Sequence, residues 1–262
     1  MRSLSIASTG MLAQQLNVEV ISNNIANMNT VAFKKQRAEF QDLLYQTFEA
    51  AGTQSSDQGT IVPTGVQVGG GVKAGAVYRV GTQGVLTRTD NQYDLAINGR
   101  GYFQVLLPSG ETAYTRAGNF SVNDQGQLVT QDGYQVQPAI SIPGDAVSVA
   151  ISASGQVQVT QAGQTAPTVA GVLELATFVN DGGLEALGGN LFKETAASGA
   201  ATTGTAGSTG IGTLVQGYTE ASNVDPVSEI TALIVAQRAY EMNSKVISTA
   251  DNMLATANQV KA

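Results

Sequence analysis

The two ends of this 262-residue chain differ in periodicity from its middle. Apolar residues that recur every seven positions predict a helix with a contact seam. The N-terminal seam comprises Leu4, Met11, Val18 and Ile25, with Ile21 and Met28 among the companions three positions further on. The C-terminal seam comprises Leu233, Tyr240, Ile247 and Leu254, with Asn243 among its companions. Asp225 followed by Pro226 predicts the N-cap and first residue of the second helix.

Between about residues 62 and 217 the pattern changes to short alternating runs, such as 101–107 and 147–151, which predict β-strands. Four pairs with glycine in second place predict tight hairpin turns: Asn98-Gly99, Ser109-Gly110, Asp132-Gly133 and Ser154-Gly155. Residues 46–60 and 196–212 have neither period. The second of these stretches is rich in Gly, Ala, Ser and Thr and predicts a flexible surface loop.

These patterns predict an α+β fold. Long N- and C-terminal helices pair as a coiled-coil-like core domain, with an inserted, mainly antiparallel β-domain and an extended linking hairpin. The predicted domains are a helical core of residues 1–32 and 224–262, an extended/β linking region of 33–90 and 208–223 that includes 46–64, and a β-domain of 91–207. Apolar residues flank both seams, so the helices require further partners. A head-to-tail contact that does not close would produce an open helical filament.

Composition excludes several function classes. The chain has no His and no Cys, which removes His-based nucleophile systems and the commonest zinc ligands. Thirteen Lys and Arg against twenty Asp and Glu give a net charge of −7, which argues against nucleic-acid binding. No apolar run is long enough to span a membrane. We therefore predict no catalytic residue, no cofactor and no metal site.

Two other function classes remain open at this point. A glycosidase that uses a pair of carboxylates survives the composition filter, and Asp90 and Asp94 are close in sequence. No aromatic sugar platform accompanies them, and Trp is absent. A β-rich binding module or adhesin is the other class, but it leaves the two heptad helices unexplained.

Several segments carry a family resemblance. Residues 5–11 (SIASTGM) and 22–34 (SNNIANMNTVAFK) resemble the N-terminal signature of the bacterial flagellar rod and hook family, and 237–245 (QRAYEMNSK) resembles its closing helix. Residues 113–120 (AYTRAGNF) and 216–224 (QGYTEASNV) also match, so the resemblance covers nearly the whole chain. Residues 46–64 resemble a segment that distal rod proteins carry and most hook proteins lack.

The resemblance implies a structural subunit of the distal rod, which self-assembles into a straight, rigid, hollow shaft and transmits torque from motor to hook. A proximal rod protein or a short hook protein is the alternative within the family. The implied partners are further copies of the chain, proximal rod proteins, the hook protein, the peptidoglycan-layer and outer-membrane ring proteins, and the flagellar type III export apparatus. The implied location is the basal body, in the periplasm after export without a cleaved signal peptide, and without insertion into a membrane.

The candidate self-assembly residues are those of the two seams together with an asparagine cluster. The full set is Leu4, Met11, Val18, Ile21, Asn23, Asn24, Ile25, Asn27, Met28, Leu233, Tyr240, Asn243, Ile247 and Leu254. With the resemblance, the asparagines are interpreted as forming hydrogen bonds between subunits. Alternatively, they fray the helix into a turn that ends at Asn29-Thr30.

Two further features allow alternatives. The basic trio Lys34, Lys35 and Arg37 is either a solvated helix end or forms an ion pair with an acidic neighbour in a polymer. Ala32 stands where the family usually has glycine. If the backbone there has a positive φ, alanine costs about 1 kcal/mol or more.

Overall fold

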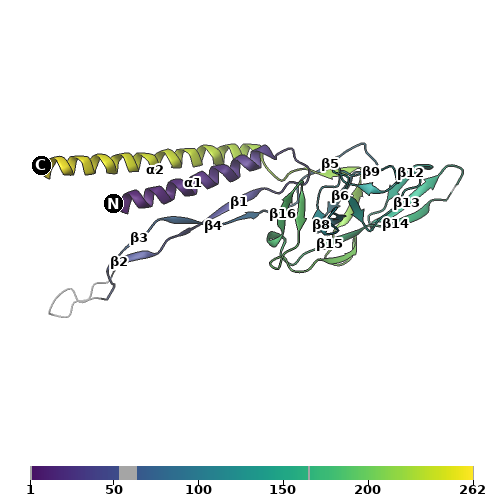
Figure 1. Cartoon of the computed structure of the whole chain (residues 1–262), viewed down its shortest axis with the longest axis horizontal. Helices are drawn as coiled ribbons and strands as arrows, with labels where there is room; N and C mark the ends of the chain where they lie inside the picture. Colours follow the sequence, from purple (N-terminus) through teal and green to yellow (C-terminus); the bar gives the residue numbers. More distant parts are fainter. Residues whose placement is uncertain (1, 53–63, 165, 262) are drawn as a thin grey trace. The chain divides into compact units, whose positions relative to one another are not determined.

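The computed structural model describes residues 2–52, 64–164 and 166–261. Within these ranges the chain is α+β, with two long α-helices and mainly antiparallel strands, as the sequence predicts (Figure 1). The chain forms two compact units. The first comprises residues 1–26, 36–78 and 225–262, and the second comprises 27–35 and 79–224.

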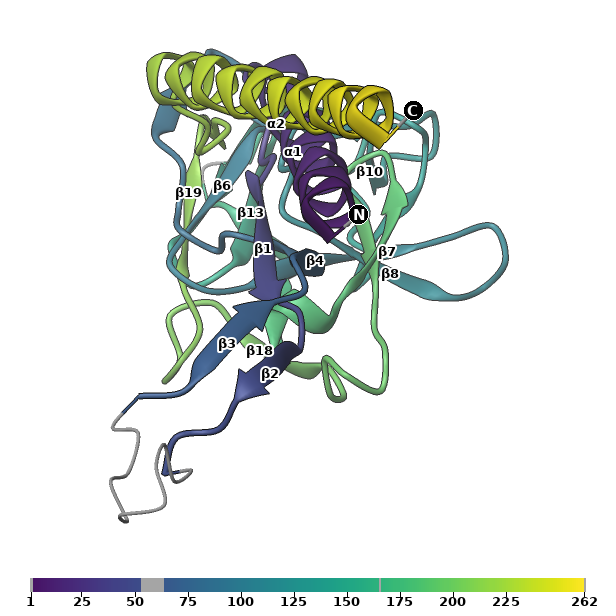
Figure 2. The same ribbon diagram turned by 90° about the vertical axis from the view of Figure 1, so that its left-hand side faces the viewer.

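The helices of the first unit are α1 (Arg2–Ala26) and α2 (Pro226–Lys261). They pack against each other in opposite directions, so that both ends of the chain lie at the same end of the pair (Figures 1 and 2). The predicted N-cap is confirmed, because the Val227 N–H donates to Asp225 Oδ1 at 3.3 Å and Pro226 begins α2. The alternative that the asparagines end the helix in a turn is confirmed, because α1 stops at Ala26 and residues 27–30 form a turn and bend.

The first unit also contains two pairs of strands, which begin earlier than residue 62. Two of these strands lie before the alternating pattern begins, inside the segment assigned to the extended/β linking region. Part of the predicted segment 46–64, residues 53–63, lies outside the described residues. The pairs are β1 (Gln36–Asp42) with β4 (Val72–Arg79), and β2 (Tyr45–Glu49) with β3 (Val66–Gly69).

The second unit holds the remaining strands, which pair antiparallel throughout its described residues. They are β5 (Leu86–Arg88), β6 (Leu95–Asn98), β7 (Tyr102–Leu106), β8 (Thr112–Thr115), β9 (Ser121–Val122), β10 (Leu128–Val129), β11 (Gln135–Gln137), β12 (Ala146–Ile151), β13 (Gln156–Gln161), β14 (Thr168–Val172), β15 (Glu174–Thr177), β16 (Glu185–Gly188), β17 (Leu191–Lys193), β18 (Thr202–Thr205), β19 (Thr213–Gln216) and β20 (Tyr218–Glu220). A single turn of 3-10 helix spans Asp181–Gly183.

A nine-stranded sheet organises the second unit. Its main path runs β16-β17-β8-β7-β11-β10-β9, and β15 joins β7 to β18. The strands β12-β13-β14 form a separate sheet, and β6 pairs with β19 and β5 with β20. Alternation along β7 is confirmed, because Phe103 and Val105 are buried while their neighbours are only half-buried. Phe103 packs edge-to-face on Phe120 at the centre of the main core, with ring centroids 5.0 Å apart.

Three of the four predicted hairpin turns are confirmed. Ser109-Gly110 joins β7 to β8, Asp132-Gly133 joins β10 to β11, and Ser154-Gly155 joins β12 to β13, each with its glycine at positive φ. The hairpin predicted at Asn98-Gly99 is wrong. Gly99 does turn the chain with a φ of 111°, but β6 pairs with β19 instead of the following strand. Local turn chemistry bends a chain without choosing its strand partner.

The flexible loop predicted for residues 196–212 is also wrong. Its central residues form β18, which pairs with β15, and both Ser198 and Ala206 are buried. The Ser198 hydroxyl donates to the Thr195 carbonyl at 2.9 Å. Most of the segment is exposed, as expected of a surface segment, but its backbone is held by strand pairing and is not a loop.

Candidate functional site

The contact between the two helices is built from small residues. On α1 the buried positions are Ala7, Ala13, Val20, Ile21 and Asn24. A Cβ at Gly10 would lie only 2.9 Å from Asn243 Nδ2 of α2, so glycine permits the close approach of the helices there. The predicted N-terminal seam lies beside this contact and not at its centre, since Leu4, Met11, Val18 and Ile25 are all half-buried.

The predicted C-terminal seam also lies beside the contact, whose buried residues on α2 include Ala236 and Ala250. Leu233, Asn243 and Ile247 are half-buried, whereas Tyr240 and Leu254 are 44% and 41% exposed. Between the helices, Val18 and Tyr240 line one groove. Of the remaining predicted residues, Asn23 and Met28 are exposed and Asn27 is half-buried. The structure therefore brings the two seams side by side within one copy and leaves part of each accessible.

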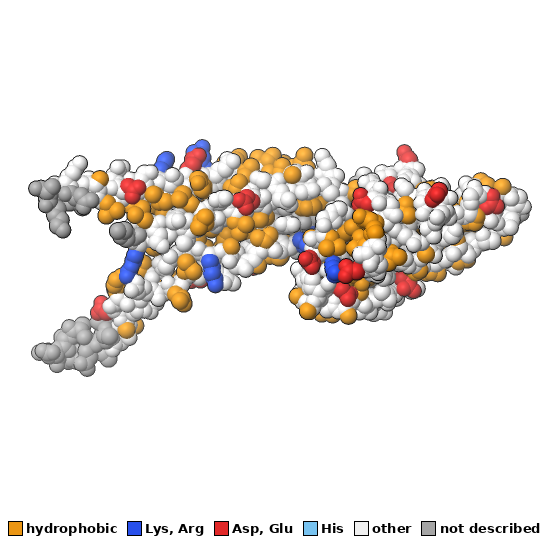
Figure 3. All heavy atoms as spheres, viewed as in Figure 1, with side chains coloured by type: hydrophobic (Ala, Val, Ile, Leu, Met, Phe, Trp, Pro, Cys, Tyr) orange, Lys and Arg blue, Asp and Glu red, His pale blue; other side chains and the backbone are white. Residues whose placement is uncertain are grey.

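Both helices carry additional apolar side chains that nothing in the described part of the chain covers. Figure 3 shows hydrophobic side chains gathered along the helical part of the molecule. Such a surface is typical of a site where another protein binds. The exposed apolar residues of the helices include Ile6, Leu12, Val227, Ile230, Ile234, Val235, Met242, Val246 and Met253.

Asn24 connects three elements of the first unit. Its Nδ2 donates to the Gln36 carbonyl at 2.8 Å and to Glu229 Oε2 at 3.1 Å, and its Oδ1 accepts the Gln36 N–H at 2.8 Å. Asn24 is 1% exposed. The amide thus joins α1, β1 and α2 inside one copy, which corrects the interpretation of Asn24 as a contact between subunits. Asn27 lies in the turn after α1, where Oδ1 accepts from the Thr30 hydroxyl at 3.0 Å.

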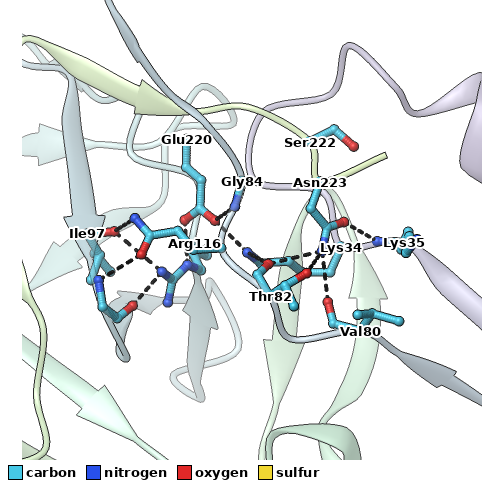
Figure 4. A network of polar contacts seen from close by, with 12 residues as sticks. Lys34, Lys35, Val80, Thr82, Gly84, Ile97, Arg116, Glu220, Ser222 and Asn223 are labelled. Carbon is cyan, nitrogen blue, oxygen red and sulfur yellow. Dashed lines mark hydrogen bonds and ion pairs between the residues drawn. The ribbon is translucent and has the colours of Figure 1, made fainter. Parts of the chain in front are cut away.

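A buried cluster of charges lies in the second unit (Figure 4). Glu220, at the end of β20, has a fully buried side chain. Its Oε1 accepts from Lys34 Nζ at 2.5 Å and from the Gly84 N–H at 2.8 Å, and its Oε2 accepts from Arg116 Nε at 2.5 Å. One carboxylate therefore joins residues that are 186 and 104 positions away in sequence.

The rest of the Arg116 guanidinium donates to backbone carbonyls. Nη1 donates to Gly101 at 3.0 Å, and Nη2 donates to Gly99 at 2.6 Å and to Ile97 at 3.4 Å. Arg116 therefore fixes the turn between β6 and β7. Because the carbonyls and Glu220 satisfy the guanidinium together, the buried charge is well solvated by the protein.

Asn223 extends this network along the neighbouring backbone. Its Oδ1 accepts the Lys35 N–H at 2.7 Å, and its Nδ2 donates to the carbonyls of Val80 and Thr82, each at 3.0 Å. Lys34 Nζ also donates to the Thr82 carbonyl at 2.9 Å. The network thus ties together the segment that follows α1 in sequence, the segment after β4 and the segment that precedes α2.

The pKa shifts within the cluster follow from burial and charge. Burial alone would raise the pKa of Glu220, but the Arg116 charge, the Lys34 hydrogen bond and the Gly84 N–H together hold that pKa below its ordinary value. Burial lowers the pKa of Lys34, and Glu220 offsets this effect only in part. The carboxylate is thus held as an anion in a protein interior.

The solvated-end interpretation of the basic trio is wrong for Lys34, whose side chain is 9% exposed. A signal for the cluster was present in the sequence. Lys34, Arg116 and Glu220 are each the only charged residue in one of the segments 22–34, 113–120 and 216–224. These three isolated charges include both signs, and buried charges are almost always paired, so a pairing among them was a possible interpretation.

Ala32 lies next to this cluster and has a φ of 57°. It is buried, and its N–H donates to the Glu220 carbonyl at 2.7 Å. Because this φ is positive, alanine is strained at this position. The structure retains the left-handed turn with a methyl group where glycine would be unstrained.

Comparison with known proteins accounts for most of the chain. Three family models match the chain. The model described as "Flagella basal body rod protein" matches residues 4–34, and "Flagellar hook protein FlgE/F/G D1 domain" matches 96–159. The model described as "Flagellar basal body rod FlgEFG protein C-terminal" matches 215–260. The members of the ion cluster lie in the first, second and third of these matches respectively.

Relatives named FlgG match this chain over nearly their full length. The flagellar basal-body rod protein FlgG of Caulobacter vibrioides is 69% identical over 262 residues, which is the whole of both chains. The FlgG proteins of Buchnera aphidicola from Acyrthosiphon pisum and of Bacillus subtilis are 49% and 40% identical, over 98% and 97% of this chain and 99% and 97% of their own lengths. The FlgF protein of the same Caulobacter strain is only 33% identical, over 94% of this chain and 91% of its own. The chain belongs to the family of flagellar basal-body rod proteins.

Proposed function

We propose that the chain is a subunit of the flagellar distal rod that polymerises with copies of itself into a straight, rigid, hollow shaft. Membership of the family makes the chain a structural protein of the flagellar rod and not an enzyme. The observation that carries the distal assignment is the 69% sequence identity with the FlgG protein of Caulobacter vibrioides over the whole of both chains. The FlgF protein of the same Caulobacter strain is far less similar.

The described surface supports polymerisation. Apolar side chains along α1 and α2 remain exposed after the helices have packed on each other. A single copy leaves this surface in water, and stacked copies would cover it. We assign residues 1–32 and 224–262 to the helical core, 33–90 and 208–223 to the linking region and 91–207 to the β-domain.

The remaining partners are those of an axial protein. They are proximal rod proteins, the hook protein, the surrounding peptidoglycan-layer and outer-membrane rings, and the type III export apparatus. The periplasm is the proposed site of assembly, after export without a cleaved signal peptide. In the described residues, no helix is long and apolar enough to cross a membrane.

Electron microscopy of the concentrated, purified protein tests this function. We expect straight hollow tubes from the wild-type chain. We expect none from Ile25→Asp or Ile247→Asp, because each would bury a charge between helices on assembly, at a cost of several kcal/mol per subunit. Val179→Asp is the matched control, since Val179 is 90% exposed in the second unit. Wild-type protein that stays monodisperse, or seam variants that polymerise normally, would contradict the proposal.

A further inference from the structure

The groove between α1 and α2 has a chemistry that indicates its occupant. It has a volume of about 370 Å³ and is lined by Gln15, Val18 and Glu19 from α1 and by Gln237, Tyr240 and Glu241 from α2. Val18 and Tyr240 supply apolar surface. Glu19 and Glu241 place an acid on each helix, one on either side of the groove. A matching occupant therefore has an apolar ridge with cations beside it.

A surface of this composition lies on α2. On α2, Val235, Met242 and Val246 are 64%, 60% and 47% exposed, and they are spaced so that they share one side of the helix. Arg238 and Lys245 lie on the same side and are exposed. We call this set, residues 235, 238, 242, 245 and 246, the outer stripe.

The outer stripe cannot fill the groove of its own copy. Successive residues of an α-helix are about 100° apart, so Met242 points about 200° away from the groove residue Tyr240. Groove and stripe are therefore different faces of one helical pair. A contact between different faces of identical molecules is heterologous, and it propagates into an open polymer when its rotation does not close.

We propose that the groove of one copy receives the outer stripe of α2 from a second copy. Met242 enters between the helices, and its flexible thioether suits an irregular groove. Arg238 and Lys245 approach Glu19 and Glu241 of the receiving copy. This inference rests on the proposed polymerisation and specifies which surfaces make one of its contacts.

Existing contacts of the charged residues are weak enough to be exchanged. Glu19 Oε1 accepts from Gln15 Nε2 at 3.1 Å on the exposed side of α1. Glu241 Oε2 lies 3.6 Å from Arg238 Nη1 in an exposed pair. Exposed pairs of this kind contribute little to the stability of a helix.

A charge-exchange experiment tests the pairing. The groove variant is Glu19→Lys with Glu241→Lys, and the stripe variant is Arg238→Glu with Lys245→Glu. Either variant alone places like charges across the contact, so we expect the protein concentration needed for polymerisation to rise at least about tenfold. An equimolar mixture restores opposite charges at every contact, and we expect it to polymerise at close to the wild-type concentration. Light scattering and electron microscopy measure both effects.

The controls separate this proposal from the proposed function. Asp90→Lys with Asp124→Lys makes the same change in net charge as the groove variant at exposed sites of the second unit, and should polymerise normally. Circular dichroism checks that each variant retains its helices. Single variants that assemble like wild type, or a mixture that is not rescued, overturn the groove-and-stripe contact and leave the distal-rod assignment standing. Failure of the wild-type chain to polymerise overturns both.

Discussion

At the scale of single residues, Glu220 is the most consequential side chain in the described structure. It is an anion without solvent contact, and its stability depends on Arg116, Lys34 and the Gly84 N–H. Removing one partner of a buried charged cluster leaves the other charges uncompensated, which is far more costly than losing an exposed pair. The exposed pair Lys193–Glu111, at 2.7 Å, offers a direct comparison.

We expect Glu220→Gln to lower the free energy of unfolding by about 3 kcal/mol or more, since an amide cannot neutralise two buried cations. Glu111→Gln, the matched control, should cost less than about 1 kcal/mol. Denaturant titrations at neutral pH measure both. Equal losses in the two variants would show that the cluster is not the stabilising feature inferred here.

The same carboxylate predicts a pH dependence. The pKa of Glu220 is lower in the folded chain than its ordinary value, so its contribution to stability is complete above that ordinary value and is lost as pH falls through the folded pKa. We expect the unfolding free energy of the wild-type protein to decline below about pH 5 more steeply than that of Glu220→Gln. Parallel pH profiles for the two proteins would contradict this.

Gly118 has no room for a side chain. A Cβ there would lie 1.6 Å from the Leu95 carbonyl oxygen, which is backbone and cannot rotate away. We expect Gly118→Ala to destabilise the protein by about 3 kcal/mol or more. At Gly144 no atom lies within 4 Å of such a Cβ, so Gly144→Ala should be neutral or slightly stabilising. Thermal unfolding of the pair distinguishes a steric cause from a general effect of added methyl groups.

At the scale of elements, Asn24 holds α1, β1 and α2 in one arrangement. We expect Asn24→Ala to cost about 2 kcal/mol or more, because it leaves the Gln36 backbone groups and Glu229 without these hydrogen bonds. Hydrogen exchange should speed up in both helices. Asn252→Ala, on the exposed side of α2, is the control and should leave exchange unchanged. Faster exchange in α1 alone would show that Asn24 does not couple the helices.

Some elements of the fold could be predicted from the sequence and others could not. Heptads located both helices, and alternation with Gly turns located β7, β8 and β12, because these patterns are local consequences of burial on one face. The pairing of β6 with β19 and the pairing of β18 with β15 depend on contacts distant in sequence. Lys34, Arg116 and Glu220 were not expected to meet, since their sequence separations carry no periodic signal.

At the scale of the whole molecule, β2 and β3 are the elements that most need a partner. All five residues of β2 are exposed, including Tyr45 and Phe48, and so are Val66 and Val68 of β3. A two-stranded ribbon is only marginally stable in water. We propose that this ribbon, whose strand β2 lies largely within segment 46–64, bridges axially between neighbouring copies and opposes sliding between them.

Deleting residues 46–64 tests that bridge. The protein should still fold and be exported, because the main core lies elsewhere. Its polymers should be curved or flexible, because subunits would slide more easily without the bridge. Electron microscopy of the deletion polymers provides the measurement, with wild-type polymers as the reference. Deletion polymers as straight as wild type would leave the segment without this role.

The buried cluster of Lys34, Arg116 and Glu220 also has a consequence for where the chain can fold. It closes loops of 186 and 104 residues with ionic contacts, as a disulfide staple would, in a chain that has no cysteine. Buried ion pairs form without an oxidant or an isomerase and without reshuffling of wrong pairs. Unlike disulfides, they do not depend on redox potential. A chain held in this way reaches the same fold in a reducing or an oxidising compartment.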